Sequence, residues 1–315
     1  MTSIMTNSAA IAALSTLRSI NSSMEATQNR ISSGYRVESA ADNAAYWSIA
    51  TTMRSDNKAL STVKDALGLG AATTDVAYTA LTSSIDVVDQ IKTKLTAASQ
   101  PGVDKNKVQK EITQLQDQLL SIAKSASFSG QNWVFNDPAN ATGTQSIVGS
   151  FNRDASGNVS LTTLQYNTGS SSLILMNATG FDNTGGILTR ERTTQEYVNS
   201  LGDTASGTFT GVMQIDIENA TFDDLQLSLV GVEAALQDMT NAAADIGALN
   251  SRIDLQSSFV ADLMDSIDMG VGKLVDADMN EESTRLKALQ TQQQLGIQAL
   301  SIANNSSQNI LSLFR

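Results

Sequence analysis

Residues 225–274 read LQLSLVGVEAALQDMTNAAADIGALNSRIDLQSSFVADLMDSIDMGVGKL, and apolar side chains recur in this stretch at every seventh position. A seven-residue apolar repeat predicts a coiled-coil seam, and a helix of this length extends for about 75 Å. Thr221-Phe-Asp-Asp224, just upstream, resembles a capping box that starts the helix. The expected rod seam comprises Leu225, Val232, Met239, Ile246, Ile253, Val260, Ile267 and Leu274.

Helical spacing also dominates the first half of the chain. Apolar residues follow three- and four-residue steps from Leu60 to Leu95 and again from Val108 to Ile122, with Pro101 between the two runs. Because proline cannot continue a helix, we expect two helices separated at this point. The predicted fold class is mainly α, with a long antiparallel coiled-coil helix bundle formed by both chain ends.

The middle of the chain has a different composition, rich in Gly, Ser, Thr and Asn. Ser146–Phe151 and Val159–Tyr166 carry strand-forming residues around a polar turn, which predicts a β-hairpin. We therefore expect a small outer insertion that is mainly β or mixed. Its other expected elements are strands at Leu173–Met176 and Val212–Ile217 and a short helix around Thr193–Leu201.

Composition excludes most catalytic and metal chemistry. The chain has 315 residues without a single Cys or His, which removes thiolate sites, disulfides, histidine-based catalysis and most zinc sites. Its 20 basic and 32 acidic residues give a net charge of −12, which disfavours nucleic-acid binding. Asp276–Glu282 invites comparison with a calcium loop, but Glu281 and Lys287 stand where that loop needs Gly and Glu. We expect no enzyme activity, no cofactor and no metal.

Both ends of the chain lack charge. Residues 1–17 and 288–314 contain no Asp, Glu, Lys or Arg, and apolar residues are spaced among Gln, Asn and Ser in the second stretch. Exposed helices on soluble proteins usually carry charged outer faces, and isolated helices are marginal in water. We expect both ends to become ordered only against neighbouring subunits.

Four motifs in these end regions resemble those of bacterial flagellins. They are Arg30–Ala45 (RISSGYRVESAADNAA), Phe128-Ser-Gly130, Gly247–Ile253 (GALNSRI) and Gln308–Arg315 (QNILSLFR). The family carries Asn where this chain has Ser129. The motifs occur in the order and with the separation that the family shows, over about the first 135 and last 95 residues.

The resemblance implies a structural subunit that is exported and polymerises into the extracellular flagellar filament for swimming motility. It implies itself or other flagellins as partners, together with the flagellar type III export apparatus, a secretion chaperone, the filament cap and hook-junction proteins. It implies no nucleic acid and no membrane insertion. The first residues show no signal-peptide pattern, which agrees with that export route. Two alternatives are a hook–filament junction-type assembly protein and a chemoreceptor-type helical hairpin, but no stretch is apolar enough for the membrane span that the second needs.

The resemblance also implies a division into domains. Residues 1–45 and 275–315 are expected to form an inner helical domain. Residues 46–165 are expected to supply the N-terminal helices and the β-hairpin of a rod domain, and residues 218–274 its C-terminal long helix. Residues 166–217 are left as a small, variable outer domain.

Two groups of site residues follow from the same resemblance. In flagellins detected by the flagellin-specific Toll-like receptor, the first long rod helix presents an Arg, a Glu and a Leu, and the corresponding residues here are Gln90, Thr93 and Lys94. This chain thus has a diverged receptor-recognition segment. The residues expected to pack the inner domain and drive polymerisation are Leu14, Leu17, Ile20, Leu295, Leu300, Ile310, Leu311 and Leu313.

Overall fold

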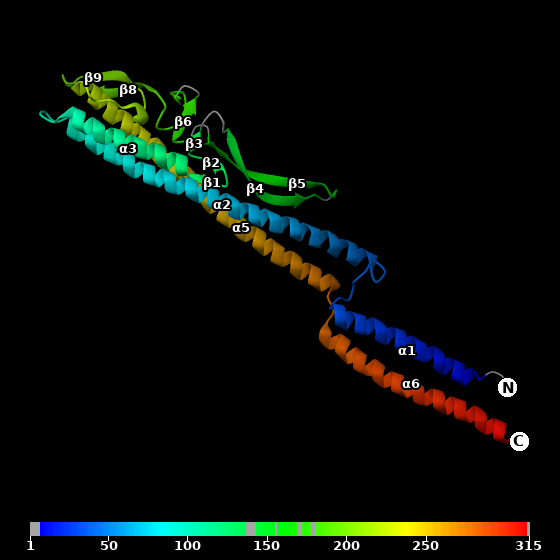
Figure 1. Cartoon of the computed structure of the whole chain (residues 1–315). Coiled ribbons are helices and arrows are strands. Elements are labelled where there is room, and N and C mark those ends of the chain that lie inside the picture. Colours follow the sequence, from blue (N-terminus) through cyan, green and yellow to red (C-terminus); the bar gives the residue numbers. More distant parts are fainter. Residues whose placement is uncertain (1–6, 137–142, 155, 169–171, 178–179, 314–315) are drawn as a thin grey trace. The chain divides into compact units, whose positions relative to one another are not determined.

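The computed structural model describes residues 7–136, 143–154, 156–168, 172–177 and 180–313, with side chains described as far as residue 305. Long helices make up most of it (Figure 1), and the predicted mainly α fold class is confirmed. Contacts divide the chain into two units, Met1–Lys58 with Met264–Arg315, and Ala59–Leu263. The long helices are α1 (Ser8–Ser33), α2 (Ala44–Ala98), α3 (Lys105–Ser125), α5 (Phe222–Val275) and α6 (Met279–Leu313).

The helices of the unit Ala59–Leu263 bury large aliphatic side chains along their lengths. On α2, Leu60, Leu67 and Leu81 are fully buried, and on α3 Ile112 and Leu119 are as well. Helix α2 ends at Ala98, so the predicted break before the proline is confirmed. Each such side chain contributes roughly 1.5–3 kcal/mol when it leaves water. This unit therefore has an apolar core of its own.

Polar caps fix the ends of these helices. Helix α5 starts with a reciprocal pair, in which the backbone N–H of Thr221 donates to the carboxylate of Asp224 (2.8 Å) and the N–H of Asp224 donates to the hydroxyl of Thr221 (3.2 Å). The predicted capping box is confirmed. The backbone N–H of Thr221, and after it the Thr221 hydroxyl, donate to this carboxylate and hold the pKa of Asp224 below its ordinary value, since they favour its charged form.

The predicted hairpin is formed by β4 (Thr144–Arg153) and β5 (Val159–Asn167), which pair antiparallel with Ile147 opposite Leu164. Both side chains are buried. Gly70 of α2 allows the close approach of this hairpin, because a Cβ at that position would lie 2.6 Å from Cγ2 of Ile147. Because Gly70 has no side chain, the hairpin can pack closely against α2 at this position.

The remaining β structure is made of short strands. β3 pairs parallel with β6 and β6 antiparallel with β7, β1 pairs antiparallel with β2, and β8 and β9 form a second hairpin. The strand expected at Leu173–Met176 is confirmed as β6. The bounds are β1 (Ser127–Phe128), β2 (Gln131–Asn132), β3 (Phe135–Asn136), β6 (Ile174–Asn177), β7 (Gly180–Phe181), β8 (Arg192–Val198) and β9 (Thr204–Phe209).

Two local predictions are wrong. The segment expected as a helix around Thr193–Leu201 is strand β8 and its turn, because its β-branched residues find a partner in β9 and Asn199 closes the turn through its side-chain oxygen. The segment Val212–Ile217 is not a strand and begins with a 3₁₀ helix, η2 (Val212–Gln214). Side chains of α3 replace a strand partner there, as Gln116 donates to the carbonyl of Val212 (2.9 Å).

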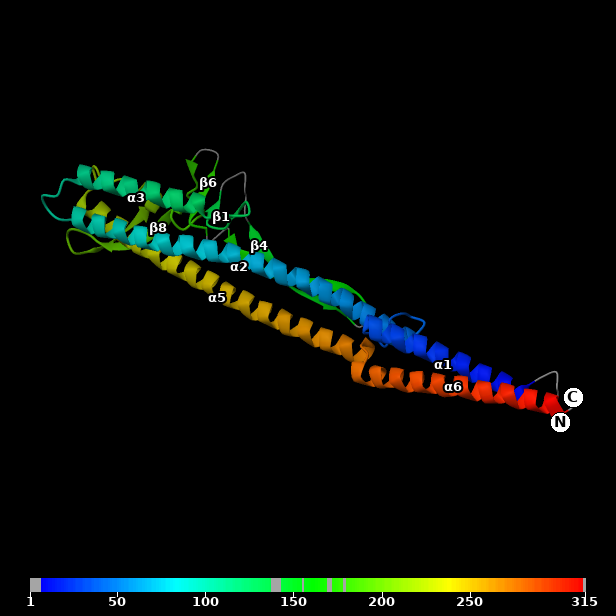
Figure 2. The same ribbon diagram turned by 60° about the horizontal axis from the view of Figure 1, so that its bottom comes forward.

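In the other unit, α1 and α6 lie side by side and antiparallel, as both ribbon views show (Figures 1 and 2). Helix α1 begins at the cap residue Asn7 and ends at Gly34, whose positive φ of 77° suits glycine. Helix α6 is capped by Asp278, whose carboxylate accepts the N–H of Asn280 (2.9 Å). Both helices of the pair therefore have defined starting points.

Candidate functional site

The α1–α6 pair is held by one stripe of residues on each helix. The least exposed residues alternate in steps of three and four on both helices, which is the spacing of a coiled-coil seam. Many of these residues are small or polar, so the seam buries less apolar surface than one built of Leu and Ile. The stripe on α1 is Ala10, Ala13, Leu17, Ile20, Met24 and Thr27, and that on α6 is Glu282, Leu286, Leu289, Gln293, Gly296, Leu300 and Ala303.

Close packing and amide hydrogen bonds connect the two stripes. A Cβ at Gly296 would lie 2.9 Å from Cδ2 of Leu17, so the missing side chain makes room for the leucine. The side chain of Gln293 donates to the side-chain oxygen of Asn21 (2.8 Å). Near the far end, the side chain of Asn7 donates to the carbonyl of Ala303 (2.9 Å). Uncharged groups thus make the cross-helix contacts over most of the seam.

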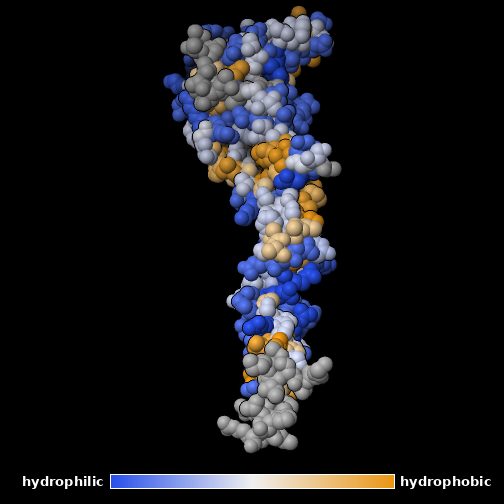
Figure 3. All heavy atoms as spheres, turned by 90° about the vertical axis from the view of Figure 1, so that its right-hand side faces the viewer, coloured by the Kyte–Doolittle hydropathy of each residue, from blue (hydrophilic) through white to orange (hydrophobic). Residues whose placement is uncertain are grey.

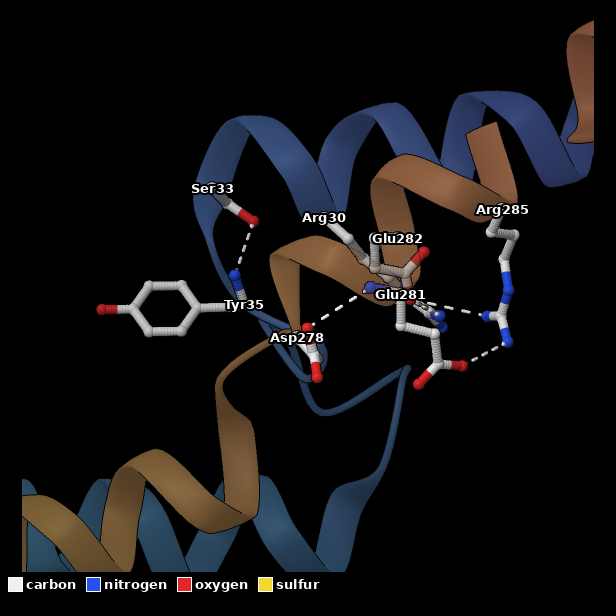
Figure 4. A network of polar contacts seen from close by, with 7 residues as sticks. All are labelled: Arg30, Ser33, Tyr35, Asp278, Glu281, Glu282 and Arg285. Carbon is white, nitrogen blue, oxygen red and sulfur yellow. Dashed lines mark hydrogen bonds and ion pairs between the residues drawn. The ribbon is translucent and has the colours of Figure 1, made fainter. Parts of the chain in front are cut away.

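A cluster of charged side chains lies at the end of the seam where α1 ends and α6 begins (Figure 4). Arg30 of α1 extends toward Glu282 in the first turn of α6, with its Nη1 3.1 Å from Oε1 of the glutamate. Arg285 lies 3.5 Å from the same oxygen and 3.0 Å from the exposed Glu281. The side chain of Glu282 is 6% exposed, and its Oε2 accepts no hydrogen bond within the described part of the chain. Its position at a helix N-terminus favours the negative charge.

Beside this cluster, backbone hydrogen bonds connect the residues that follow α1 with the residues between α5 and α6. The N–H of Ala277 donates to the carbonyl of Gly34 (2.9 Å), and the N–H of Arg36 donates to the carbonyl of Val275 (2.7 Å). The guanidinium of Arg36 adds a hydrogen bond to the carbonyl of Leu274 (2.9 Å). A cluster of buried apolar side chains also forms at this junction, and it consists of Val37, Ala50, Val271 and Val275.

The turn between α1 and α2 is tied by Asp42. Its Oδ2 accepts the backbone N–H of Ser39 (2.9 Å), the hydroxyl of Ser39 (3.0 Å) and the N–H of Glu38 (3.2 Å). The backbone hydrogen bond from Ser39 is the main cause that holds the pKa of Asp42 below its ordinary value. The charged form of this carboxylate therefore stabilises the turn.

The predicted polymerisation residues fall into three groups. Leu17 is buried and Ile20 and Leu300 are half-buried within the α1–α6 seam, whereas Leu14 and Leu295 are exposed. The side chains of Ile310, Leu311 and Leu313 lie outside the described residues, although all three belong to α6.

Further exposed apolar residues on the same helices were not expected from the sequence. Ile11 on α1 and Ile297 and Ile302 on α6 are all more than half exposed, and Figure 3 shows apolar side chains at the surface near the chain ends. Uncharged residues surround them on α6. Exposed apolar residues among uncharged neighbours, as on α6 from residue 288 onward, are typical of surfaces that other chains cover.

The rod-seam residues are buried along most of α5. Leu225, Val232, Met239, Ile246, Ile253 and Val260 are at most 1% exposed. Toward the end of the helix, Ile267 and Leu274 are half-buried, and Val271 and Val275 take the buried positions. The seven-residue stripe therefore shifts by one position near the junction.

The diverged segment lies on α2. Gln90 and Thr93 are exposed, and the ammonium group of Lys94 forms an ion pair with Glu111 of α3 (2.6 Å). Gln90 and Lys94 also line an open polar groove together with Lys110 of α3. The segment thus presents the amide of Gln90, the hydroxyl of Thr93 and the ammonium group of Lys94, which is paired with Glu111.

The sequence did not reveal the contact between Arg30 and Glu282. In the sequence, Arg30 begins a family motif and Glu282 ends an acidic segment, and neither observation links the two residues. The stripe of α6 would have been visible as a three–four repeat from Glu282 to Ala303. Its polar members hide that pattern from a search for apolar residues alone.

The described residues contain no group of three acidic side chains that could hold a metal ion. Asp278 of the segment compared with a calcium loop instead caps α6, because its carboxylate accepts the N–H of Asn280. None of the described helices is long and apolar enough to cross a membrane.

Comparisons with known proteins match both end regions. The bacterial flagellin N-terminal helical region matches residues 4–137, and the bacterial flagellin C-terminal helical region matches residues 229–314. Flagellin C and Flagellin A of Rhizobium meliloti (strain 1021) are 57% and 50% identical, and a flagellin of Brucella melitensis biotype 1 is 45% identical, each over the whole of both chains. The chain therefore belongs to the bacterial flagellin family, the structural subunits of the flagellar filament.

Proposed function

We propose that this chain is exported from the cell and polymerises into the extracellular filament through its paired terminal helices. One observation carries this proposal. The α1–α6 pair buries a single stripe of each helix and leaves Leu14, Leu295 and Ile302 on outward faces. Ile302 is 70% exposed, and no charged residue occurs from residue 288 to residue 314. Such faces are poorly suited to permanent contact with water.

Burial of these side chains between subunits supplies the driving force. Each large apolar side chain contributes roughly 1.5–3 kcal/mol on leaving water, and this gain offsets the entropy of ordering the helices. Contacts that repeat head-to-tail without closing produce an open polymer. A small loss per subunit therefore acts at every addition.

Several finer parts of the assignment belong to the same proposal. We assign residues 1–45 and 275–315 to an inner domain, 46–165 and 218–274 to a rod domain, and 166–217 to an outer domain. Export through the flagellar type III apparatus, a secretion chaperone, the cap and hook-junction proteins complete the partners. The role is structural and not enzymatic. Full-length similarity to proteins named flagellin supports a filament subunit over a hook–filament junction protein.

Seeded elongation tests the proposal. Leu295→Asp places a charge on the outward face of α6 at a side chain that is 58% exposed, so the monomer should fold normally. We expect wild-type filament fragments not to be elongated by this variant, as measured by light scattering. Leu201→Asp is the matched control, because it makes the same change at an exposed turn between β8 and β9. Elongation by Leu295→Asp at the wild-type critical concentration would contradict the proposal.

A further inference from the structure

Helix α5 carries an exposed ridge made of Arg252, Leu255 and Phe259. These residues follow one another at spacings of three and four, so their side chains share one face of the helix. Leu255 is 74% exposed and Phe259 is 56% exposed, and the exposed Arg252 makes no ion pair with any described residue. Apolar anchors at this spacing are typical of a helix that docks in the groove of a partner.

The same unit, Ala59–Leu263, contains an apolar groove between α2 and the end of α3. Its volume is about 410 Å³, which is within the usual range of binding pockets. Its apolar lining includes Val76 and Ile122. Among the described residues that line it, only Asp75 carries a charge. Its Oδ1 accepts the side-chain amide of Asn250 on α5 (2.6 Å), and this hydrogen bond fixes the position of the exposed carboxylate.

A chain cannot place this ridge in its own groove. The contacts of Asp75 with Asn250 and of Lys92 with Glu233 show that α2 and α5 run antiparallel. From Asp75, the groove continues along α2 in the direction of Lys92. From Asn250, the ridge continues along α5 toward Phe259, away from Glu233. The ridge and the groove thus extend in opposite directions, and only a second molecule can bring them together.

We propose that the ridge of one copy of this chain docks in the groove of a second copy, where Arg252 pairs with Asp75. This inference rests on the proposed function, because it adds a second contact to the same polymer. The two surfaces match, since apolar side chains meet an apolar lining and the one cation meets the one carboxylate. Two copies that each carry a net charge of −12 repel each other, so a contact between them benefits from such a pair. Because ridge and groove are different surfaces, the contact repeats from copy to copy.

Seeded elongation tests both surfaces. Leu255→Asp changes the ridge and Thr79→Lys places a charge in the groove, and each should raise the critical concentration for elongation at least fivefold. Thr82→Lys is the matched control for the groove, because Thr82 is also exposed on α2 but does not line the groove. Leu201→Asp is the control for the ridge. Both controls should elongate wild-type seeds at the wild-type critical concentration, and thermal unfolding checks that each monomer is folded.

Charge reversal tests the pairing of Arg252 with Asp75. Arg252→Asp and Asp75→Arg each bring like charges together, so each should raise the critical concentration at least threefold. A chain with both changes restores an ion pair between copies and should elongate nearly as well as wild type. If Asp75 acted only by binding Asn250 within its own chain, the second change would not rescue the first.

Cross-linking tests the contact directly, because the chain has no cysteine of its own. Chains with Leu255→Cys and chains with Thr79→Cys are mixed in equal amounts, assembled on wild-type seeds and treated with a short bismaleimide. Each chain carries one cysteine, so a covalent dimer reports a contact between copies. We expect at least fivefold more dimers than with Thr82→Cys in place of Thr79→Cys. Each variant assembled alone gives the background from pairs of like cysteines.

Elongation by Leu255→Asp and Thr79→Lys at the wild-type critical concentration would overturn the inference, as would equal dimer yields with Thr79→Cys and Thr82→Cys. The cross-linking comparison leaves both charged residues in place, so it decides the case if Asp75→Arg does not fold. Failure of wild-type chains to elongate seeds would overturn the proposed function and this inference with it. Normal wild-type elongation with unaffected variants would overturn this inference alone.

Discussion

The α2–α5 contact and the α1–α6 contact are both long antiparallel helix pairs, but they differ in what they bury. Within the unit Ala59–Leu263, the seam positions hold large aliphatic side chains that are fully buried, such as Leu60, Leu67, Ile253 and Val260. In the α1–α6 pair, full burial is limited to Leu17, Thr27 and Glu282 among the described seam residues. We therefore expect the first pair to be stable in the single chain and the second to depend on neighbouring chains.

The two helix pairs share a similar spacing of seam positions but differ in the size and polarity of the residues that occupy them. Large residues at the repeat bury apolar surface worth roughly 25 cal/mol per Å², and we expect them to hold α2 and α5 together in the single chain. Small and amide residues hold several of the corresponding positions between α1 and α6, and apolar residues such as Leu295 and Ile302 stay exposed, so we expect this pair to be weaker. We expect polymerisation to supply the stability that this pair lacks in the single chain.

The largest effect is expected from a charge in the α5 seam. Ile253 is 1% exposed, so Ile253→Asp buries an unpaired carboxylate in an apolar contact and should destabilise the monomer by about 3–5 kcal/mol. Thermal unfolding followed by circular dichroism measures this loss. Leu255→Asp, at a site 74% exposed on the same helix, should leave the melting temperature nearly unchanged. Similar melting temperatures for both variants would show that the α2–α5 contact is not the stable member of the comparison.

Receptor sensing is expected to be weak. The resemblance implies that Gln90, Thr93 and Lys94 stand where detected flagellins have an Arg, a Glu and a Leu, and Lys94 is paired with Glu111. Loss of a charge pair and an apolar anchor typically weakens an interface by more than about 2 kcal/mol, which is about thirtyfold. A reporter-cell assay for the flagellin-specific Toll-like receptor should therefore give little response. Nanomolar potency would show that the divergence of this segment has no consequence for recognition.

A smaller effect is expected from acid at the junction turn. The pKa of Asp42 is lowered in the folded chain, so its contribution is present above the unfolded pKa of about 3.9 and is lost as pH falls through the folded value. Hydrogen exchange at the amides of Glu38 and Ser39 should accelerate below about pH 4 relative to the intrinsic rate. Asp42→Asn should remove that pH dependence. The same pH dependence in the variant would assign it to another group.

Much of the fold was predictable because helix patterns are local. The seven-residue repeat from Leu225, the break at Pro101 and the capping box at Thr221 are each decided within a few turns of chain. The helix prediction around Thr193 was wrong because this segment pairs with β9, whose sequence (Thr204–Phe209) has few strand-forming residues. The strand prediction after Val212 was wrong because Gln116, about a hundred residues earlier, donates a hydrogen bond to the carbonyl of Val212 in place of a partner strand. Such partners cannot be read from neighbouring residues.

The candidate site was predictable only in part. The lack of charge at both ends leads us to expect that other chains cover them, and the predicted residues Leu17 and Leu295 lie on the two paired helices. The pairing of Arg30 with Glu282 joins residues 252 positions apart, and no local pattern indicates it. The space that Gly296 leaves for Leu17 is equally invisible, since a glycine within a helix has several possible causes.

Hydrogen exchange on monomer and filament tests the central difference between the two helix pairs most directly. We expect amides of α2 and α5 within the unit Ala59–Leu263 to be strongly protected in both states, because their seam is fully buried without a partner. Amides of α1 and α6 should exchange rapidly in the monomer and become protected by at least a hundredfold in the filament. Equal protection of α1–α6 and α2–α5 in the monomer would contradict the account.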